Sequence, residues 1–346
     1  MKNTFGSALC LTIFGESHGA GGGAVLDGMA AGVPVDPAAL AALMDKRRAR
    51  GDGLSTARVE ADEVRILSGV VNGRTTGTPL TLLIENRNTR SGDYAATAAL
   101  LRPGHADYTA YARYRGWQDA RGGGHFSGRI TAGLVAGGGV VLGALERAGV
   151  RIATHIARCA GLADTSFAQD DPAALAAQLD VLAARGAGFA LLDQSAEAPM
   201  QAAIRAAGSK GDSVGGILET AILGLPAGVG EPFFDSVESV LAHMAFSVPA
   251  VKGIEFGAGF GFADLRGSQA NDPLRIRDGH IYTETNRNAG INGGLANGMP
   301  VVYRTVVKPT PSIYKEQRTV DYKAGENASL SIKGRHDPCI VPRAAV

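Results

Sequence analysis

The sequence predicts a mixed α+β fold in one domain. Apolar residues make up 45% of the 346 residues, so the chain can bury a sizeable core and global disorder is not expected. Strand-like stretches occur along the chain but do not alternate regularly with helices, which argues against a doubly wound parallel sheet. No linker rich in Ser, Pro or charge divides the sequence, so residues 1–346 are expected to form a single domain.

Four helices are expected. Asp-Pro pairs at 36–37 and 171–172 each place an N-cap and a first-turn proline before an apolar periodic run, and the second of these runs ends at Gly186. Two further helices are expected over residues 127–146 and 235–245. Strand composition marks residues 217–223, 304–307 and 329–332.

A faint internal echo suggests two related halves. Residues 22–34 resemble residues 215–228, and each segment precedes an expected helix. A similar strand-like run then follows, at 63–69 in the first half and at 251–257 in the second. A pseudo-two-fold relation explains the echo, and chance similarity in a Gly/Ala-rich chain is the alternative.

Charge and hydropathy favour a cytoplasmic protein without nucleic acid or membrane partners. The net charge is +1, from 34 Lys+Arg and 33 Asp+Glu, so no anionic polymer or surface is indicated. The apolar run at 8–14 stops at Glu16 without a cleavage pattern, which argues against a signal peptide. The uncharged run from Ile130 to Leu145 is shorter than the ~20 residues of a spanning helix, so a buried helix is expected.

The three cysteines, Cys10, Cys159 and Cys339, are far apart in the sequence. They form no C-x-x-C pair, so neither a metal site nor a disulfide framework is indicated. Free thiols in a reducing cytosol are expected.

Two loops place a histidine among small residues. The motif GESHG at 15–19 carries His18, and RPGHAD at 102–107 carries His105 beside Asp107. Glycines let the backbone approach a ligand closely, and an imidazole exchanges protons near neutral pH. On its own, GESHG is equally compatible with a turn that carries a surface histidine, and RPGHAD is more typical of an ordinary polar turn.

The run GGGHFSGR at 122–129 opens an expected helix. Free backbone N–H groups before a helix favour an anion, and Arg129 adds a charged donor. The run lacks both the Walker ending and the dinucleotide G-x-G-x-x-G context, so neither nucleotide fingerprint applies. Basic residues at 46–50 end the first helix, where a solvated face that complements the helix dipole is the alternative to a site.

Together these motifs, in this order and over nearly the whole chain, resemble the chorismate synthase family. The set comprises GESHG, TGTPLTLLIEN at 76–86, RPGHAD, the Gly-rich loop, LRGSQ at 265–269, KPTPS at 308–312 and GRHDPC at 334–339. The resemblance implies a β-α-β sandwich with helices between two four-stranded antiparallel sheets, assembled as a homotetramer. It implies a lyase of the shikimate pathway of aromatic amino acid biosynthesis, which converts 5-enolpyruvylshikimate 3-phosphate to chorismate and phosphate by 1,4-elimination. Reduced FMN is needed, although no net redox change occurs.

The resemblance also implies roles for individual residues. His18 is the expected proton donor near the leaving phosphate, His105 stabilises the anionic flavin near N1, and Asp337 accepts a proton at flavin N5. The phosphate and two carboxylates of the substrate suit planar, paired guanidinium donors. The arginines assigned to the substrate are Arg47, Arg102, Arg129 and Arg335. The residues assigned to FMN are His125, Phe126, Ser127, Pro249, Ala250, Gly293, Lys308, Pro309, Thr310, Pro311, Ser312 and Arg335.

The chain departs from the family pattern at three places. Many members have arginine where this chain has His125, and a further arginine near Gly53, for which Arg50 or Arg58 is expected to compensate. Members normally continue into another helix after GRHDPC, which is expected to be missing here. These departures leave open a flavin-phosphate binding protein of the same fold without this catalysis.

Two further expectations concern partners. An Arg/Gly-rich RNA-binding module is disfavoured, because the net charge is near zero and no stacking-aromatic motif is present. Some family members reduce their own flavin with NADPH. With no dinucleotide fingerprint in the sequence, outside supply of reduced flavin is favoured here.

Overall fold

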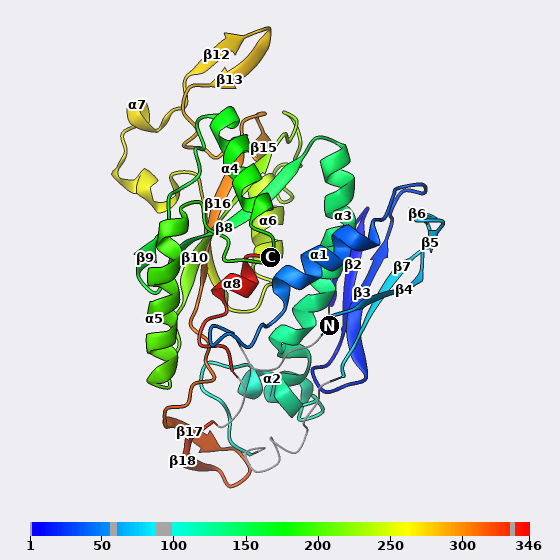
Figure 1. Ribbon diagram of the computed structural model, residues 1–346, viewed down its shortest axis with the longest axis vertical. Coiled ribbons are helices and arrows are strands. Elements are labelled where there is room, and N and C mark those ends of the chain that lie inside the picture. The colour runs from blue at the N-terminus through cyan, green and yellow to red at the C-terminus, as the bar shows by residue number, and fades with distance from the viewer. Residues whose placement is uncertain (1, 56–60, 88–98, 333–335) are drawn as a thin grey trace.

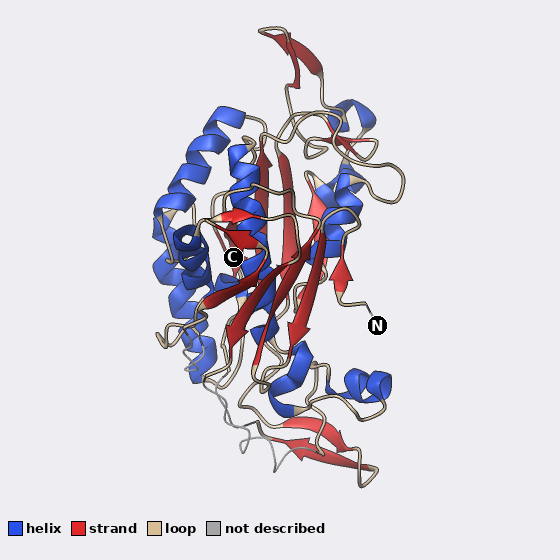
Figure 2. Cartoon of the chain, turned by 90° about the vertical axis from the view of Figure 1, so that its right-hand side faces the viewer, coloured by secondary structure: helices blue, strands red, loops and turns tan. Residues whose placement is uncertain are grey.

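The computed structural model describes residues 2–55, 61–87, 99–332 and 336–346. Within these ranges the chain forms two antiparallel sheets with helices between them (Figures 1 and 2). The first sheet has the order β1 (Thr4–Phe5), β2 (Cys10–Gly15), β3 (Gly21–Asp27), β7 (Leu80–Glu85), β4 (Val64–Ser68). The second has the order β11 (Val251–Phe256), β16 (Val301–Val307), β10 (Gly216–Leu223), β8 (Arg151–Cys159), β9 (Leu162–Ala163).

The predicted α+β sandwich is therefore confirmed. Each sheet contains the four expected longer strands, and the structure adds one two-residue strand at an edge, β1 in the first sheet and β9 in the second. Short hairpins complete the strands. They are β5 (Val70–Val71) with β6 (Arg74–Thr75), β12 (Leu274–Arg277) with β13 (His280–Thr283), β14 (Ile291–Asn292) with β15 (Leu295–Ala296), and β17 (Gln317–Asp321) with β18 (Glu326–Leu330).

The two sheets share one strand order, which gives the sequence echo a structural basis. The order is β2-β3-β7-β4 in one sheet and β8-β10-β16-β11 in the other. In each half the second strand leads to a helix, α1 (Pro37–Arg47) or α6 (Val237–Ala245). The next of these strands along the chain lies at the far edge of the sheet, and the last one pairs between that edge strand and the second strand. The echoing segments 22–34 and 215–228 contain most of the equivalent strands β3 and β10.

Equivalent glycines end these two strands. Gly28 has φ +90°, and a Cβ there would lie 2.0 Å from the carbonyl oxygen of Ala8. Gly224 has φ +87°, and a Cβ there would lie 2.2 Å from the carbonyl oxygen of Gly149. Only glycine meets both demands, so the same turn is specified in both halves.

The four expected helices are present: α1, α3 (Thr131–Arg147), α4 (Pro172–Ala184) and α6. Asp36 and Asp171 cap α1 and α4, each accepting two backbone N–H bonds, as the Asp-Pro pairs predict. Two other helices, α2 (Asp107–Tyr114) and α5 (Glu197–Ser209), were not predicted from the sequence. Short α7 (Gly267–Ala270) and α8 (Val341–Ala344) complete the set among the described residues.

Helix α3 lies directly on the first sheet (Figure 1). A Cβ at Gly133 would lie 2.5 Å from the carbonyl oxygen of Gly23 in β3, so the helix backbone rests on the strand backbone. Ala136 and Val140 are buried in the same core as Leu82 of β7. By length and composition Gly128–Arg147 is the one described helix able to cross a membrane, but that criterion is also met by core helices such as this one.

A charged cluster is buried in the second sheet. His155 of β8 is fully buried, with Nδ1 2.9 Å from Asp164 Oδ2 and Nε2 3.0 Å from Glu219 Oε2. Burial alone would lower the pKa of His155. The hydrogen bonds and charges of Asp164 and Glu219 outweigh it and raise the pKa, which favours the imidazolium.

Replacing His155 by glutamine is expected to lower the free energy of unfolding by about 3 kcal/mol near pH 6, because two buried carboxylates lose their cation. Since the folded-state pKa of His155 is raised, its stabilisation is complete below the unfolded value of about 6.5 and is lost as pH rises through the folded value. Urea unfolding on either side of that window measures the difference. His280→Gln, on the exposed hairpin β12–β13, is the matched control and is expected to change stability by less than about 0.5 kcal/mol. Equal losses in the two variants would contradict the assignment.

Candidate active site

The loop that carries His18 joins β2 to β3. Ser17 is 1% exposed and His18 is 9% exposed. The Ser17 N–H donates to the carbonyl of Gly124 at 3.0 Å, which ties the loop to the Gly-rich run. The Asn86 side chain, just after β7, donates to two carbonyls of the loop at 2.9 Å each. Ser17 and His18 of the GESHG motif are therefore buried, and hydrogen bonds from neighbouring segments fix the turn.

The Gly-rich run packs against both histidines. Gly122 has φ +61°, and a Cβ there would lie 2.3 Å from His18 Cε1. Gly123 has φ +85°, and a Cβ there would lie 2.8 Å from His105 Cε1. A side chain at either position would push a histidine away, and the backbone conformation also disfavours one. One loop thus brings together two histidines that are 87 positions apart (105 minus 18) in the sequence.

His105 belongs to a fixed charge cluster with Arg102 and Asp107. Asp107 Oδ1 lies 2.8 Å from His105 Nδ1 and 2.7 Å from an Arg102 NH2 group, and Oδ2 accepts from Arg102 Nε at 2.8 Å. Burial alone would raise the pKa of Asp107, but the hydrogen bonds from Arg102 and His105 outweigh it and hold the pKa well below its usual range. The carboxylate therefore stays charged, and both it and Arg102 lie within hydrogen-bond distance of His105 Nδ1. Nε2 of His105 faces the Gly-rich run.

Arg47 and Arg129 share one buried carboxylate. Arg47, at the end of α1, is 2% exposed and its NH1 lies 2.6 Å from Asp62 Oδ2. Arg129 pairs with the other oxygen of Asp62. Burial lowers the pKa of Arg47 to about 10, and Asp62 opposes that shift. Two guanidinium groups therefore meet at one buried carboxylate.

The arginine pair is linked to the His18 loop. Arg129 Nε donates to Asn86 Oδ1 at 3.0 Å, and Asn86 holds the loop through its amide group. The basic residues at 46–50 therefore differ in their surroundings. Arg47 lies in the buried cluster, whereas Arg50 pairs with Asp45 at 2.9 Å on the exposed side of the helix end.

The segment that follows β18 reaches the same cluster. Asp337 pairs with Arg343 at 3.1 Å, and Arg343 Nε donates to the backbone carbonyl of Arg47 at 3.1 Å. Burial and the charges of Arg102 and His105 lower the pKa of His336 to about 4, so His336 lies close to these two residues. Asp337 is therefore positioned between the arginine pair and the histidine cluster.

The KPTPS segment follows β16 and lies beside the RPGHAD loop. Lys308 Nζ donates to the carbonyl of Gly104 at 2.5 Å, and the Lys308 N–H donates to the carbonyl of Ala250 at 2.9 Å, so Pro249 and Ala250 border the segment. The carbonyl of Thr310 accepts from Ser213 at 2.7 Å. Thr310 Oγ1 is buried and has no hydrogen-bond partner among the described residues.

The same segment continues through Pro309, Pro311 and Ser312. A Cβ at Gly104 would lie 3.1 Å from Pro311 Cβ, and Ser312 is 7% exposed. The segment and the loop are therefore in contact at Gly104.

His125, Phe126 and Ser127 connect the Gly-rich run to α3. His125 Nδ1 lies 2.8 Å from the carbonyl oxygen of Gly15, which joins the run to the end of β2. The Ser127 hydroxyl accepts the N–H of Arg129 at 3.2 Å, and Phe126 packs edge-on against Tyr114. One ring nitrogen of His125 is used in this contact with Gly15, so His125 offers a ligand fewer hydrogen-bond donors than an arginine would.

Most of the predicted site residues come together, but Gly293 does not. Gly293 lies in the turn of the β14–β15 hairpin, which precedes β16, whereas Lys308 follows the other end of that strand. A Cβ at the neighbouring Gly294 would lie 2.7 Å from Ser236, so the hairpin packs against the start of α6, away from the cluster. Arg335 lies outside the described residues, as does Arg58.

Three residues of the cluster were not singled out from the sequence: Asp62, Asn86 and Arg343. Asn86 is the last residue of the TGTPLTLLIEN motif, so the motif could have identified it as a candidate site residue. Asp62 and Arg343 stand in segments with no motif that points to a buried pair.

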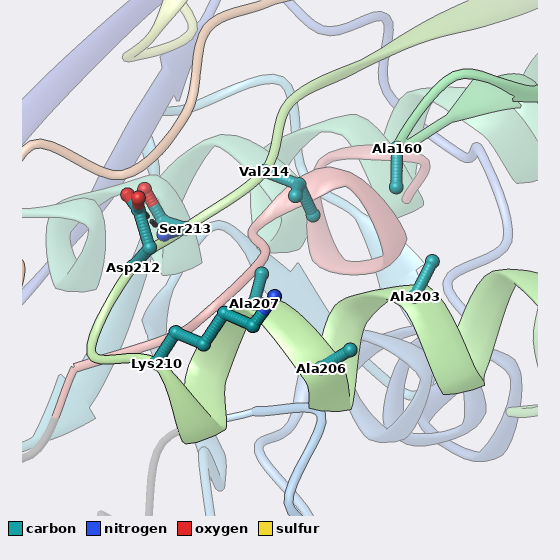
Figure 3. A pocket seen from close by; sticks show the side chains of 8 residues that line it. All are labelled: Ala160, Ala203, Ala206, Ala207, Lys210, Asp212, Ser213 and Val214. Carbon is teal, nitrogen blue, oxygen red and sulfur yellow. Dashed lines mark hydrogen bonds between the residues drawn. The ribbon is translucent and has the colours of Figure 1, made fainter.

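A hollow of about 420 Å³ lies beside α5 (Figure 3). It is lined by Ala160, Ala203, Ala206, Ala207, Lys210, Asp212, Ser213 and Val214. The Val214 N–H donates to the carbonyl of Pro338 at 2.9 Å, so the hollow borders the GRHDPC segment on the side of α5. None of the residues predicted from the sequence lines it.

Comparisons with known proteins agree with this arrangement. The family model for chorismate synthase matches residues 9–346. The chorismate synthase of Dehalococcoides mccartyi (strain ATCC BAA-2266 / KCTC 15142 / 195) is 43% identical over 344 residues, 99% of this chain and 92% of the relative. That of Methanosarcina barkeri is 45% identical over 341 residues, 99% and 91% of the two chains. A crystal structure of chorismate synthase superposes with a TM-score of 0.72 at 27% identity, covering 88% of this chain and 85% of the other. With motif order, sheet topology and overall similarity all in accord, the chain belongs to the chorismate synthase family.

Proposed function

We propose that this chain is a chorismate synthase, a lyase that converts 5-enolpyruvylshikimate 3-phosphate to chorismate and phosphate by 1,4-elimination. Family membership supports the overall activity. The observation that carries the residue-level proposal is the Gly-rich run at 122–124, against which His18 and His105 both pack. Arg102 lies beside Gly123, and Arg129 is linked to the His18 loop through Asn86, so a ligand with negative charge is favoured there.

The arginines hold the substrate anions in this proposal. Arg47 and Arg129, which meet at Asp62, are the guanidinium groups proposed for a phosphate or carboxylate. Arg102 is oriented by Asp107 and turns its charge toward His105. Fixed cations of this kind also stabilise charge on the departing phosphate without having to reorganise.

Proton transfer falls to the acid–base side chains. His18 holds a proton near the leaving phosphate, where general acid catalysis typically contributes about 10²–10⁴-fold. His105 is oriented by the contact between its Nδ1 and Asp107, and its Nε2 faces the Gly-rich run of the proposed site. Asp337, paired with Arg343, is a carboxylate able to accept a proton.

The chain's own residues fit a flavin with a phosphate tail. Two buried polar atoms, Thr310 Oγ1 and His336 Nε2, have no hydrogen-bond partner among the described residues, and both lie at the proposed site. Lys308, Thr310 and Ser312 would hold the cofactor together with the residues at 125–127. When bound, reduced FMN supplies electron density that assists departure of phosphate, without net redox change.

A homotetramer, located in the cytoplasm, completes the proposal. Gly293 is distant from the cluster within one chain, so its assigned contact to FMN requires another copy of the chain. Large apolar side chains are available for such contacts: Phe233 and Phe234 are 89% and 91% exposed.

Phosphate release, followed with reduced FMN, oxidised FMN and no flavin, tests the function. Release is expected only with reduced FMN. Turnover without flavin would contradict the proposal, and flavin binding without any turnover would favour the alternative of a flavin-phosphate binding protein. NADPH as sole reductant is expected to give no turnover, because reduced flavin is supplied from outside.

His18→Ala and Asp337→Ala are each expected to lower turnover by about 10²–10⁴-fold, since each removes a proton-handling group. Flavin affinity, measured by fluorescence titration, is expected to stay within about threefold, because neither residue is assigned to the phosphate of FMN. The exposed His280→Ala is the control and keeps full activity. Full activity in both test variants would show that the roles are wrongly assigned.

Gly122→Ala is expected to lower turnover by about 10²-fold, because the added Cβ displaces His18. Gly186→Ala is the matched control: its φ of +58° resembles the +61° of Gly122, but no atom lies within 4 Å of the added Cβ. Both variants carry similar backbone strain of about 1–2 kcal/mol. Equal turnover in the two would mean that the contact with His18 does not matter.

Asp62→Asn is expected to lower the free energy of unfolding by about 3 kcal/mol, because Arg47 and Arg129 lose their shared carboxylate. Inorganic phosphate is expected to restore part of this loss by binding between the arginines. Urea unfolding with and without phosphate measures both effects. Asp45→Asn, in exposed pairs with Arg48 and Arg50, is expected to cost less than about 1 kcal/mol and to show no phosphate dependence. A phosphate response of the same size in both variants would argue against an anion site at the pair.

A further inference from the structure

Two cysteines that are 180 positions apart in the sequence meet in the core. Cys159 ends β8, and Cys339 lies two residues after Asp337 in the GRHDPC segment. Their Sγ atoms are 3.6 Å apart, and the residues are 0% and 1% exposed. The sequence spacing gave no indication of this contact. Cys10 is partly exposed and lies in β2 of the other sheet.

We propose that Cys159 and Cys339 form a modification site: a small peroxide joins them in a reversible disulfide that links the second sheet to the segment carrying Asp337. The thiols are already in contact, so no large rearrangement is needed. A disulfide requires an S–S distance of about 2.05 Å, so the sulfurs must approach by roughly 1.5 Å.

The pair has the asymmetry that oxidation requires. The hydrogen bond from the Cys339 thiol lowers the pKa of Cys159 against the opposing effect of burial, and the same hydrogen bond raises the pKa of Cys339. Cys159 is therefore the thiol of the pair that more readily forms the thiolate, and it acts as the nucleophile. It attacks one peroxide oxygen, forming a sulfenic acid and releasing hydroxide. Cys339 then displaces the sulfenic hydroxyl, so two thiols and one hydrogen peroxide give one disulfide and two waters.

The hollow in Figure 3 offers the oxidant a path. Ala160, next to Cys159, and Val214 both line it. The same two residues pack against the core cluster that contains both cysteines. A small uncharged peroxide in the hollow would thus lie against residues that pack on the core cluster of the two thiols.

The cross-link would act on Asp337 through Cys339. Cys159 is fixed, because β8 pairs with β10 on one side and with β9 on the other. Cys339 must therefore move toward the second sheet. It lies between Asp337 and Arg343, and Arg343 holds the carbonyl of Arg47 in the other half. Drawing Cys339 toward β8 pulls this segment away from Arg47 and displaces Asp337. The expected loss of turnover rests on the proposed function, whereas disulfide formation does not.

Peptide mapping of the full-length protein after mild hydrogen peroxide treatment tests the site. Trypsin releases Cys159 in peptide 159–185 and Cys339 in peptide 336–343, which are expected as one linked species lighter by two hydrogens. Dithiothreitol is expected to separate them. Separate peptides with intact or singly oxidised cysteines, under conditions that oxidise Cys10, would overturn the proposal.

Turnover of the same samples tests the consequence. A fall of roughly tenfold on oxidation, restored by dithiothreitol, is expected from a displacement of about 1 Å at Asp337. Cys159→Ser is expected to keep its activity under peroxide, and Cys10→Ser is expected to lose activity as the unmodified chain does. A linked peptide with unchanged turnover would overturn the effect on Asp337. An untreated chain without turnover would instead indicate failure of the proposed function.

Discussion

The site depends on a backbone conformation that side chains would forbid. Gly122, Gly123 and Gly124 all have positive φ, and the first two leave no space for a Cβ beside His18 and His105. The run is held at both ends, by the Ser17 N–H on the carbonyl of Gly124 and by His125 on the carbonyl of Gly15. Two loops from distant parts of the chain can approach each other because this third loop occupies so little volume.

Charge is distributed around this loop in a connected way. Asp62 holds Arg47 and Arg129, Arg129 holds Asn86, and Asn86 holds the loop of His18. Such a chain of contacts fixes the geometry before any ligand arrives, which lowers the entropic cost of binding.

The fold was predicted where its signals are local. Asp36 and Asp171 cap their helices with their own side chains, so α1 and α4 could be found from the sequence. Helices α2 and α5 could not, because their N-cap residues, Ala106 and Ala196, make no side-chain cap bond. The expected strand at 329–332 ends at Leu330, where the β17–β18 hairpin stops.

The candidate site shows the same division. Motifs identified His18, His105 and the arginines through resemblance to a family, and the structure gathers those that it describes. Asp62 acts only through partners at positions 47 and 129 and adopts a left-handed φ of +49°, so nothing in its own neighbourhood marks it. Proximity of this kind is decided by the packing of whole sheets, which no local pattern records.

The common strand order of the two sheets has an evolutionary consequence. A duplicated ancestral unit of four strands and one helix is the simplest account of β2-β3-β7-β4 and β8-β10-β16-β11. Equivalent strand ends then diverged: the end of β2 leads into the loop of His18, whereas the end of β8 carries Cys159. Matching positions of the two halves therefore carry different groups, a histidine loop in one and a cysteine in the other.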